Sequence, residues 1–126
     1  MARYQKFIIV KNWNGDKVNI RLGYPMFHSD LLTKQDEKDN IDCYGGGFWD
    51  IDFNNKIIKL FGDSSDFGRP KIEDIKKAIQ NMDDHQWWQF AWIVERVFED
   101  YFEIMEIEPI SDKELKTYKF DIKDYE

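Results

Sequence analysis

One segment of this chain, Phe48–Phe53, alternates large apolar side chains with aspartates, and this pattern leaves few folds open. Successive side chains of a β-strand point to opposite faces, so a period of two is typical of a strand with one buried face. Asn54-Asn55 follows at once, and asparagine tolerates the left-handed backbone of a tight turn. We therefore predict an antiparallel hairpin, in which a two-residue turn leads into a second strand over Lys56–Phe61.

Glycine flanks this hairpin on both sides. Gly45, Gly46 and Gly47 precede the first strand, and the loop Gly62–Gly68 follows the second. Glycine in or beside a strand removes a packing side chain and weakens the ladder, so its presence needs a compensating reason. The two common reasons are a backbone conformation that other residues avoid and a close approach of the backbone to another group. A run of three glycines is most often a bulge or a tight bend.

The rest of the chain predicts further strands and helices. Strands are expected at residues 4–10 and 17–22, and the alternating runs 103–109 and 117–125 also resemble strands. Helices are expected in three places, which are residues 26–32 with Pro25 in the first turn, a segment opened by Pro70, and residues 85–102. The last of these also fits a strand in part, and its length favours a helix. Residues 34–40 are expected to be a polar linker.

These elements describe one α/β or α+β domain with a mixed, mostly antiparallel sheet flanked by helices. A chain of 126 residues has single-domain size and is long enough to bury one core. Residues 1–82 are the expected core unit. Residues 83–126 are an acidic C-terminal extension packed on it, which adds a helix and strands.

Composition excludes several functional classes. Apolar residues make up 42% of the chain and aromatic residues 17%, too many for a disordered protein. No apolar run approaches the ~20 residues of a membrane span, and no secretory signal pattern is present. The single cysteine, Cys43, cannot form an intramolecular disulfide, and no Cys/His set has zinc spacing. We expect a cytoplasmic protein that needs no membrane, cofactor or metal.

Charge is unevenly distributed along the chain. The net charge is −7, but basic side chains outnumber acidic ones in residues 1–34, whereas acidic ones dominate residues 82–126. Acidity of this kind argues against nucleic acid as a partner. It leaves room for an anion site built from the N-terminal half.

Few residues are suited to acid–base chemistry near neutral pH. His28 and His85 are the two histidines. Taken alone, His28 is most simply a capped helix histidine, and His85 a surface or capping residue. The loop Asp63–Asp66 is either an anion-binding nest of backbone N–H groups or a plain connection to the next helix. Lys6, in the first strand, is either a site residue or a lysine that protects a sheet edge.

The order of these signals resembles the Janus/Ocnus family, which includes the protein-histidine phosphatases. In that family a strand lysine and a helix histidine precede a glycine triplet, a hairpin and a "YGxSxxYG"-type loop. Here Lys6 in "KFIIV" and His28 in "FHSDLL" match the first two features. The segment from Gly45–Gly47 to "LFGDSSDFG" matches the others without a gap. The resemblance covers roughly residues 3–80.

The resemblance implies a phosphatase-like fold and the metal-independent hydrolysis of a phosphoramidate, such as phosphohistidine or phospholysine on a protein. His28 would be the catalytic general base for water. Lys6 would bind the phosphoryl group together with the loop residues Ser64, Ser65 and Asp66. These roles suit the reaction, because phosphoryl transfer depends mainly on positioning and charge stabilisation.

The resemblance also makes a spatial prediction. His28 and Lys6 should face the 64–66 loop across one open, polar pocket, with the backbone of Gly45–Gly47 passing close to it. Arg21 is an approximate counterpart of an arginine that precedes the family's helix, and it is carried as a further substrate-binding candidate.

Two departures from the family support other functions. Where Asp66 stands, the family has a small neutral residue, and a carboxylate about 4 Å from one phosphate charge costs about 4 kcal/mol at an effective dielectric of 20. The alternative is therefore a non-enzymatic binding module that holds a nucleotide, another anionic small molecule or a protein partner. Residues 83–126 have no counterpart in the family and would then mediate assembly, such as homo-oligomerisation. A third reading, an interaction protein, requires Trp87, Trp88 and Trp92 to be exposed, whereas the pattern favours the core.

Overall fold

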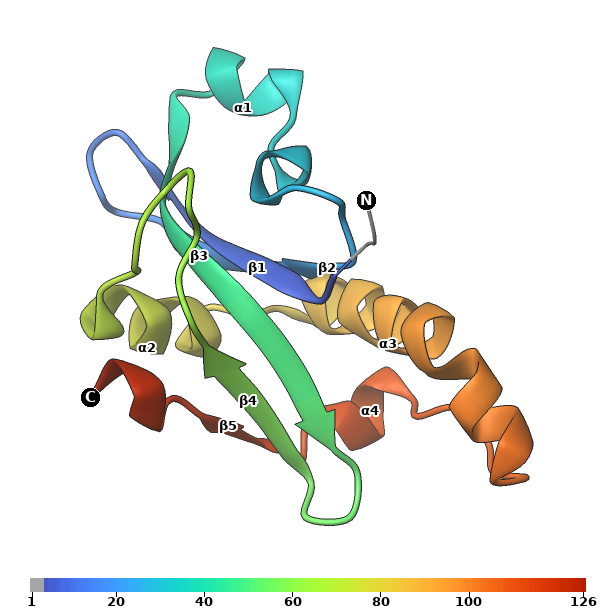
Figure 1. Ribbon diagram of the computed structural model, residues 1–126. Coiled ribbons are helices and arrows are strands. Elements are labelled where there is room, and N and C mark those ends of the chain that lie inside the picture. Colours follow the sequence, from blue (N-terminus) through green and yellow to red (C-terminus); the bar gives the residue numbers. More distant parts are fainter. Residues whose placement is uncertain (1–3) are drawn as a thin grey trace.

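The computed structural model describes residues 4–126, and the alternating segment of the sequence lies at its centre (Figure 1). That segment belongs to β3, the longest strand of a five-stranded sheet of order β2-β1-β3-β4-β5. The strands are β1 (Lys6–Asn12), β2 (Val18–Gly23), β3 (Ile41–Asp52), β4 (Ile57–Phe61) and β5 (Lys119–Asp121). The helices are η1 (His28–Leu31), α1 (Lys34–Lys38), α2 (Ile72–Gln80), α3 (Asp84–Ile104), α4 (Asp112–Leu115) and η2 (Lys123–Tyr125).

Antiparallel pairing dominates the sheet. β1 pairs antiparallel with both β2 and β3, and β3 pairs antiparallel with β4. β5 is parallel to β4, which makes the sheet mixed. The predicted α+β class with a mostly antiparallel sheet flanked by helices is therefore confirmed.

The predicted hairpin is present, but its turn is longer than two residues. Asp52 of β3 pairs with Ile57 of β4, so residues 53–56 form the connection. The Asp52 carboxylate accepts hydrogen bonds from the N–H groups of Asn54 and Asn55, each at 3.0 Å. The left-handed residue is Lys56, with φ of 55°. The two-residue turn was wrong because the aspartate, rather than the asparagine pair, organises the loop.

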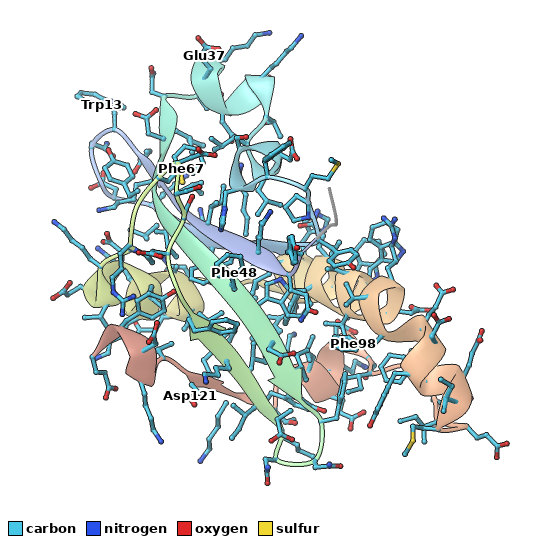
Figure 2. The ribbon with its side chains drawn as sticks, in the orientation of Figure 1. Trp13, Glu37, Phe48, Phe67, Phe98 and Asp121 are labelled. Carbon is cyan, nitrogen blue, oxygen red and sulfur yellow. The ribbon has the colours of Figure 1, made fainter. Side chains whose placement is uncertain are left out.

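Helices α2 and α3 cover one face of the sheet and enclose the main core (Figure 1). Trp49 of β3 is almost fully buried there, and its ring meets that of Phe90 of α3 edge-on at 5.0 Å. Pro70 precedes α2 as predicted, and Lys71 is the residue before its first turn. α3 begins with a capping box in which Asp83 and Gln86 bond to each other's N–H groups. Its dihedrals break at Phe98, which Figure 2 labels beside the helix.

Four short segments differ from their predicted structure. Residues 34–40 contain the helix α1, because Thr33 and Asp36 form a capping box that satisfies its first N–H groups. Residues 103–109 hold the end of α3 and a turn, and contain no strand. Residues 117–125 hold the three-residue strand β5 and the 3-10 turn η2 in place of one longer strand. The helix expected at 26–32 is the single 3-10 turn η1.

Residues 83–126 pack on the sheet and share its core. Phe90, Val94 and Leu115 are buried with the strand residues. Tyr125, near the end of the chain, packs edge-on against Phe7 of β1, with ring centroids 6.3 Å apart, and donates a hydrogen bond to Gly62 O at 2.6 Å. None of the helices within residues 4–126 combines the length and the apolar character needed to cross a bilayer.

The tryptophans of α3 divide between core and surface. Trp87 is buried, whereas Trp88 is 58% and Trp92 50% exposed. The prediction that all three belong to the core was wrong for these two. The helical period of 3.6 turns only one side of α3 toward the sheet, and Trp88 and Trp92 lie off that side.

Candidate functional site

A pocket of about 510 Å³ brings three distant segments of the chain together. Lys6 comes from β1, His28 from η1, and Ser65 and Asp66 from the loop that follows β4. Four of the residues that the sequence singles out therefore line one cavity. Ser64, in the same loop, is 3% exposed and is not among the residues that line the cavity.

Strand register places the pocket on the sheet face opposite α2 and α3. Lys6 pairs with Phe48 of β3, and the next pair on the same face is Ile8 with Gly46. Phe7 lies between them in sequence and points to the helix-covered core. Figure 2 shows Phe48 over β3 near the middle of the sheet.

The pocket walls are more apolar than predicted. Tyr4, Phe27, Met26 and Phe48 line it together with the polar residues. Phe48 packs its ring edge-on against the His28 imidazole, with centroids 5.4 Å apart. The expected polar pocket is therefore an aromatic one with a few polar groups.

Gly46 allows His28 to lie directly on the sheet. The His28 Nε2 is 2.9 Å from Gly47 O, and the residue is only 6% exposed. A Cβ on Gly46 would lie 2.9 Å from His28 Cδ2 and 2.8 Å from Phe7 O, distances that real Cβ atoms do not show. Gly45 has a φ of 134° and carries its backbone against Pro70. Both common reasons for strand glycines thus apply within this triplet.

Hydrogen bonding fixes which nitrogen of His28 is available for chemistry. A carbonyl oxygen only accepts, so Nε2 carries the proton that it donates to Gly47 O. In the neutral ring Nδ1 then keeps a lone pair. Nδ1 has no hydrogen-bonding partner among residues 4–126, and no unpaired polar side-chain atom of these residues is fully buried. Nδ1 therefore keeps some contact with solvent.

The surroundings of His28 favour its neutral form. Burial lowers the pKa of His28, the bond to Gly47 opposes this, and the Lys6 charge lowers the pKa further. The Asp66 carboxylate acts in the opposite direction, as the smallest of these effects. The result is an imidazole that can accept a proton at Nδ1.

Lys6 supplies a fixed positive charge beside the imidazole. The residue is 7% exposed, and Nζ donates a hydrogen bond to Met26 O. Nζ lies 5.1 Å from the Tyr4 ring centroid and 6.0 Å from that of Phe27, which are favourable cation–π positions. Lys6 thus has a defined position, and only one of its three donors is used by the carbonyl.

The loop after β4 is organised mainly by its own hydrogen bonds. Ser64 Oγ accepts from the N–H groups of Asp66 and Phe67, each at 3.2 Å. Ser64 also pairs with Gly68 through both backbone groups. Ser64 and Asp66 therefore have no N–H free for an anion. The donors left for a ligand in this part of the loop are the N–H and hydroxyl of Ser65.

Arg21 lies outside the pocket. It reaches from β2 to α1, where two guanidinium nitrogens each bond to Asp36 at 2.6 Å, and it also donates to Leu31 O at 2.9 Å. Hydrogen bonds from Arg21 lower the pKa of Asp36 to about 2. The arginine tethers the segment that carries His28, so it positions this segment and is not among the residues that line the pocket.

Sequence reasoning did not single out the aromatic wall or the second carboxylate of the pocket. Asp63 lines it together with Asp66, so two acidic groups face one lysine. The position of Phe48 could have been predicted from the sequence, because successive side chains of β3 alternate between faces and Phe48 therefore lies on the face opposite Trp49. Among residues 4–126, no cluster of three His, Cys, Asp or Glu side chains is arranged to hold a metal ion.

Two comparisons with known proteins, by family model and by curated sequence, found no match. No protein-family model fits the sequence, and no curated protein is similar to it. The likeness to the Janus/Ocnus pattern therefore depends on the quoted sequence residues alone.

Proposed function

We propose that the His28 pocket hydrolyses a phosphoramidate, such as phosphohistidine or phospholysine on a protein, without a metal ion. The supporting observation is that Lys6, His28 and Ser65, which are far apart in sequence, line one cavity of about 510 Å³. A phosphoryl group needs a base, a cation and hydrogen-bond donors within a few ångströms of one another. These three residues supply one of each.

In this proposal His28 Nδ1 is the general base. It takes a proton from a water molecule as the water oxygen forms a bond to phosphorus. The phosphorus–nitrogen bond breaks, and the leaving nitrogen takes its proton from solvent. Gly47 O holds the imidazole in the required tautomer, because Nε2 keeps its proton throughout.

Lys6 and Ser65 would hold the phosphoryl oxygens. The charge of Lys6 is most effective in a partly desolvated pocket, where Tyr4, Phe27 and Phe48 limit access of water. Those rings also offer an apolar wall for the imidazole ring or alkyl chain of the substrate residue.

Binding without hydrolysis is the second candidate, and the two carboxylates favour it. Asp63 and Asp66 give the pocket more negative than positive charge when His28 is neutral. A phosphoryl dianion is repelled by such a pocket unless both carboxylates turn away from it. The ligand would then be a less highly charged anion, such as a small-molecule carboxylate or a phosphate diester, held by Lys6 and the aromatic wall.

One experiment separates these functions. Hydrolysis of phosphoramidate and of a phosphohistidine peptide is followed by ³¹P NMR in the presence of a chelator, with wild type, His28→Ala and His85→Ala. His85 stacks on Trp88 of α3, away from the pocket, and is the matched control. We expect His28→Ala to lose roughly 10²–10⁴-fold in rate, the range for a general base, and His85→Ala to match wild type.

The outcomes are distinct. Equal rates for wild type and His28→Ala would refute the base role. A wild type that binds anions at Lys6 but hydrolyses neither substrate would support the second candidate. A wild type that neither hydrolyses these compounds nor binds anions at this pocket would reject both.

A further inference from the structure

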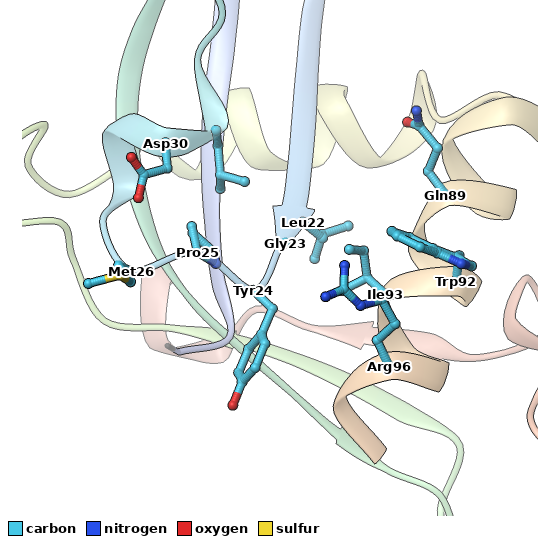
Figure 3. Close-up of a pocket in the computed structure, with 11 residues that line it drawn as sticks. Leu22, Gly23, Tyr24, Pro25, Met26, Asp30, Gln89, Trp92, Ile93 and Arg96 are labelled. Carbon is cyan, nitrogen blue, oxygen red and sulfur yellow. The ribbon is translucent and has the colours of Figure 1, made fainter. Parts of the chain in front are cut away.

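A groove runs along the outer edge of β2, between α3 and the η1–α1 segment. It consists of two adjoining cavities of about 480 and 430 Å³, which share Leu22, Leu31 and Gln89 in their walls. Figure 3 shows the first cavity, where Ile93 and Arg96 of α3 extend toward Leu22 at the end of β2. The proposed hydrolysis uses none of these side chains.

Two hydrogen bonds define how β2 pairs with β1. Asn12 N–H donates to Lys17 O at 3.3 Å at one end, and Tyr4 N–H donates to Pro25 O at 3.1 Å at the other. Both bonds continue the register of the strand pair, in which hydrogen-bonded residues alternate with residues that are not. The β2 residues bonded to β1 are therefore Asn19, Arg21 and Gly23.

The other residues of β2 direct their N–H and C=O groups away from β1. Val18 O accepts a hydrogen bond from Asn81 Nδ2 at 3.0 Å, which agrees with this direction and closes one end of the edge. The corresponding groups of Ile20 and Leu22 have no hydrogen-bonding partner within residues 4–126. Unpaired groups in such a row are a template for a further strand.

The groove walls limit what can reach this edge. α3, through Gln86 and Gln89, forms one wall, and Leu31 and Thr33 form the other. Paired strands lie about 4.8 Å apart. A second folded copy would therefore have to insert its own edge strand between these walls, together with the helices and strands attached to that strand. A single extended chain carries no such layers.

Side chains at the Gly23 end of the groove indicate the chemistry of that chain. The Arg96 guanidinium lies over the Trp92 ring at 4.9 Å and makes no ion pair with a described carboxylate. Leu22, Pro25 and Ile93 form an apolar surface beside it. The cavity also holds the Asp30 carboxylate, which accepts a hydrogen bond from the N–H of Phe27. Beside Arg96, this end fits an apolar side chain next to a carboxylate.

We propose that the β2 groove binds an extended peptide segment of a partner protein as an added strand. The peptide backbone would bond to the N–H and C=O groups of Ile20 and Leu22. One apolar side chain of the peptide would pack between Leu22 and Trp92, and an adjacent Asp or Glu would pair with Arg96. Main-chain bonds supply affinity in this mode, and the side-chain pocket supplies selectivity.

The test uses a phage-displayed library of random peptides of about nine residues, enough to pair along a whole edge strand. Selected peptides are titrated into ¹⁵N-labelled protein. We expect enrichment of peptides with an apolar–acidic pair. Their binding should protect the Ile20 and Leu22 amides from hydrogen exchange, and leave the His28 resonances unchanged.

Two matched variants control the test. Gln89→Trp fills the groove from the wall that both cavities share, and should weaken peptide binding by about tenfold or more, the effect of blocking a contact at the centre of an interface. Glu95→Trp adds the same ring at an exposed position of α3 that does not line the groove, and should not weaken it. Arg96→Glu should remove the preference for acidic peptides.

Several results would overturn the proposal. These are no enriched peptide, binders that perturb His28 instead of Ile20 and Leu22, or equal affinity for Gln89→Trp and Glu95→Trp. A wild-type dimer that Gln89→Trp converts to monomer would assign the groove to a second copy of this chain instead.

Discussion

Replacing Asp36 with asparagine tests how strongly the Arg21–Asp36 pair holds the segment that carries His28. Hydrogen bonds from Arg21 lower the pKa of Asp36 from 3.8 to about 2. One pKa unit corresponds to about 1.4 kcal/mol, so this change is equivalent to about 2.5 kcal/mol. The Arg21 side chain is 31% exposed, and screening by solvent reduces the expected contribution to about 1–2 kcal/mol.

The sign of the pH dependence follows from the lowered pKa. The unfolded chain binds a proton at Asp36 at a higher pH than the folded chain does, so the pair stabilises the fold above about pH 5. That stability is lost as the pH falls from about 4 through 2, when the folded carboxyl also takes up its proton. Asp36→Asn should therefore be less stable than wild type by about 1–2 kcal/mol at pH 7, and the difference should shrink toward zero near pH 2.

Urea denaturation at several pH values between 7 and 2 measures this difference. Asp39→Asn is the matched control, because Asp39 follows the same helix, is exposed and accepts its side-chain bond from Gln35 rather than from an arginine. A difference between wild type and Asp36→Asn that does not change with pH would refute the reasoning. An equal loss in Asp39→Asn would show that a carboxylate at either end of α1 has the same effect.

Three further predictions concern the pocket. Gly46→Ala places a methyl group 2.8 Å from Phe7 O and 2.9 Å from His28 Cδ2, so it should cost about 1–3 kcal/mol in urea denaturation. Gly15→Ala, whose Cβ would have no atom of the described residues within 4 Å other than its chain neighbours, measures backbone strain alone. Asp66→Asn should tighten inorganic phosphate binding measured by calorimetry at low salt; an unchanged Kd would mean that the carboxylate points away from the bound anion. Because burial lowers the pKa of His28, acidification from pH 7 to 5 should destabilise wild type more than His28→Gln, and equal slopes in thermal denaturation would contradict this.

The central hairpin could be predicted from the sequence because its cause is local. Alternation in Phe48–Phe53 sets which side chains are buried, and this pattern has no helical equivalent. The turn length was missed, since Asp52 caps the loop with a side chain that the alternating pattern had already assigned to the solvent face. Helix α1 was missed for a related reason. Its first turn is capped by Thr33 and Asp36, and Asp36 is also bonded to Arg21 of β2.

The site, like the fold, could be predicted from the sequence only in part. Lys6, His28 and the 64–66 loop were chosen from residue type and order, and each keeps a second, structural explanation until their positions are known. The structure brings Lys6, His28, Ser65 and Asp66 to one pocket and leaves Arg21 outside it. Arginine is long enough to reach several partners, and which carboxylate it pairs with depends on segments far apart in the chain.

The sequence by itself determined the strand pattern of β3 and β4, the positions of the main helices and the residue types available for acid–base chemistry, because propensity and side-chain period act over a few residues. Only the tertiary structure decided which face of the sheet Lys6 and Phe48 share with His28, which nitrogen of that imidazole is open, and that Trp88 and Trp92 are exposed. Those outcomes depend on strand register and helix packing, and both are set by contacts between residues that are distant in sequence.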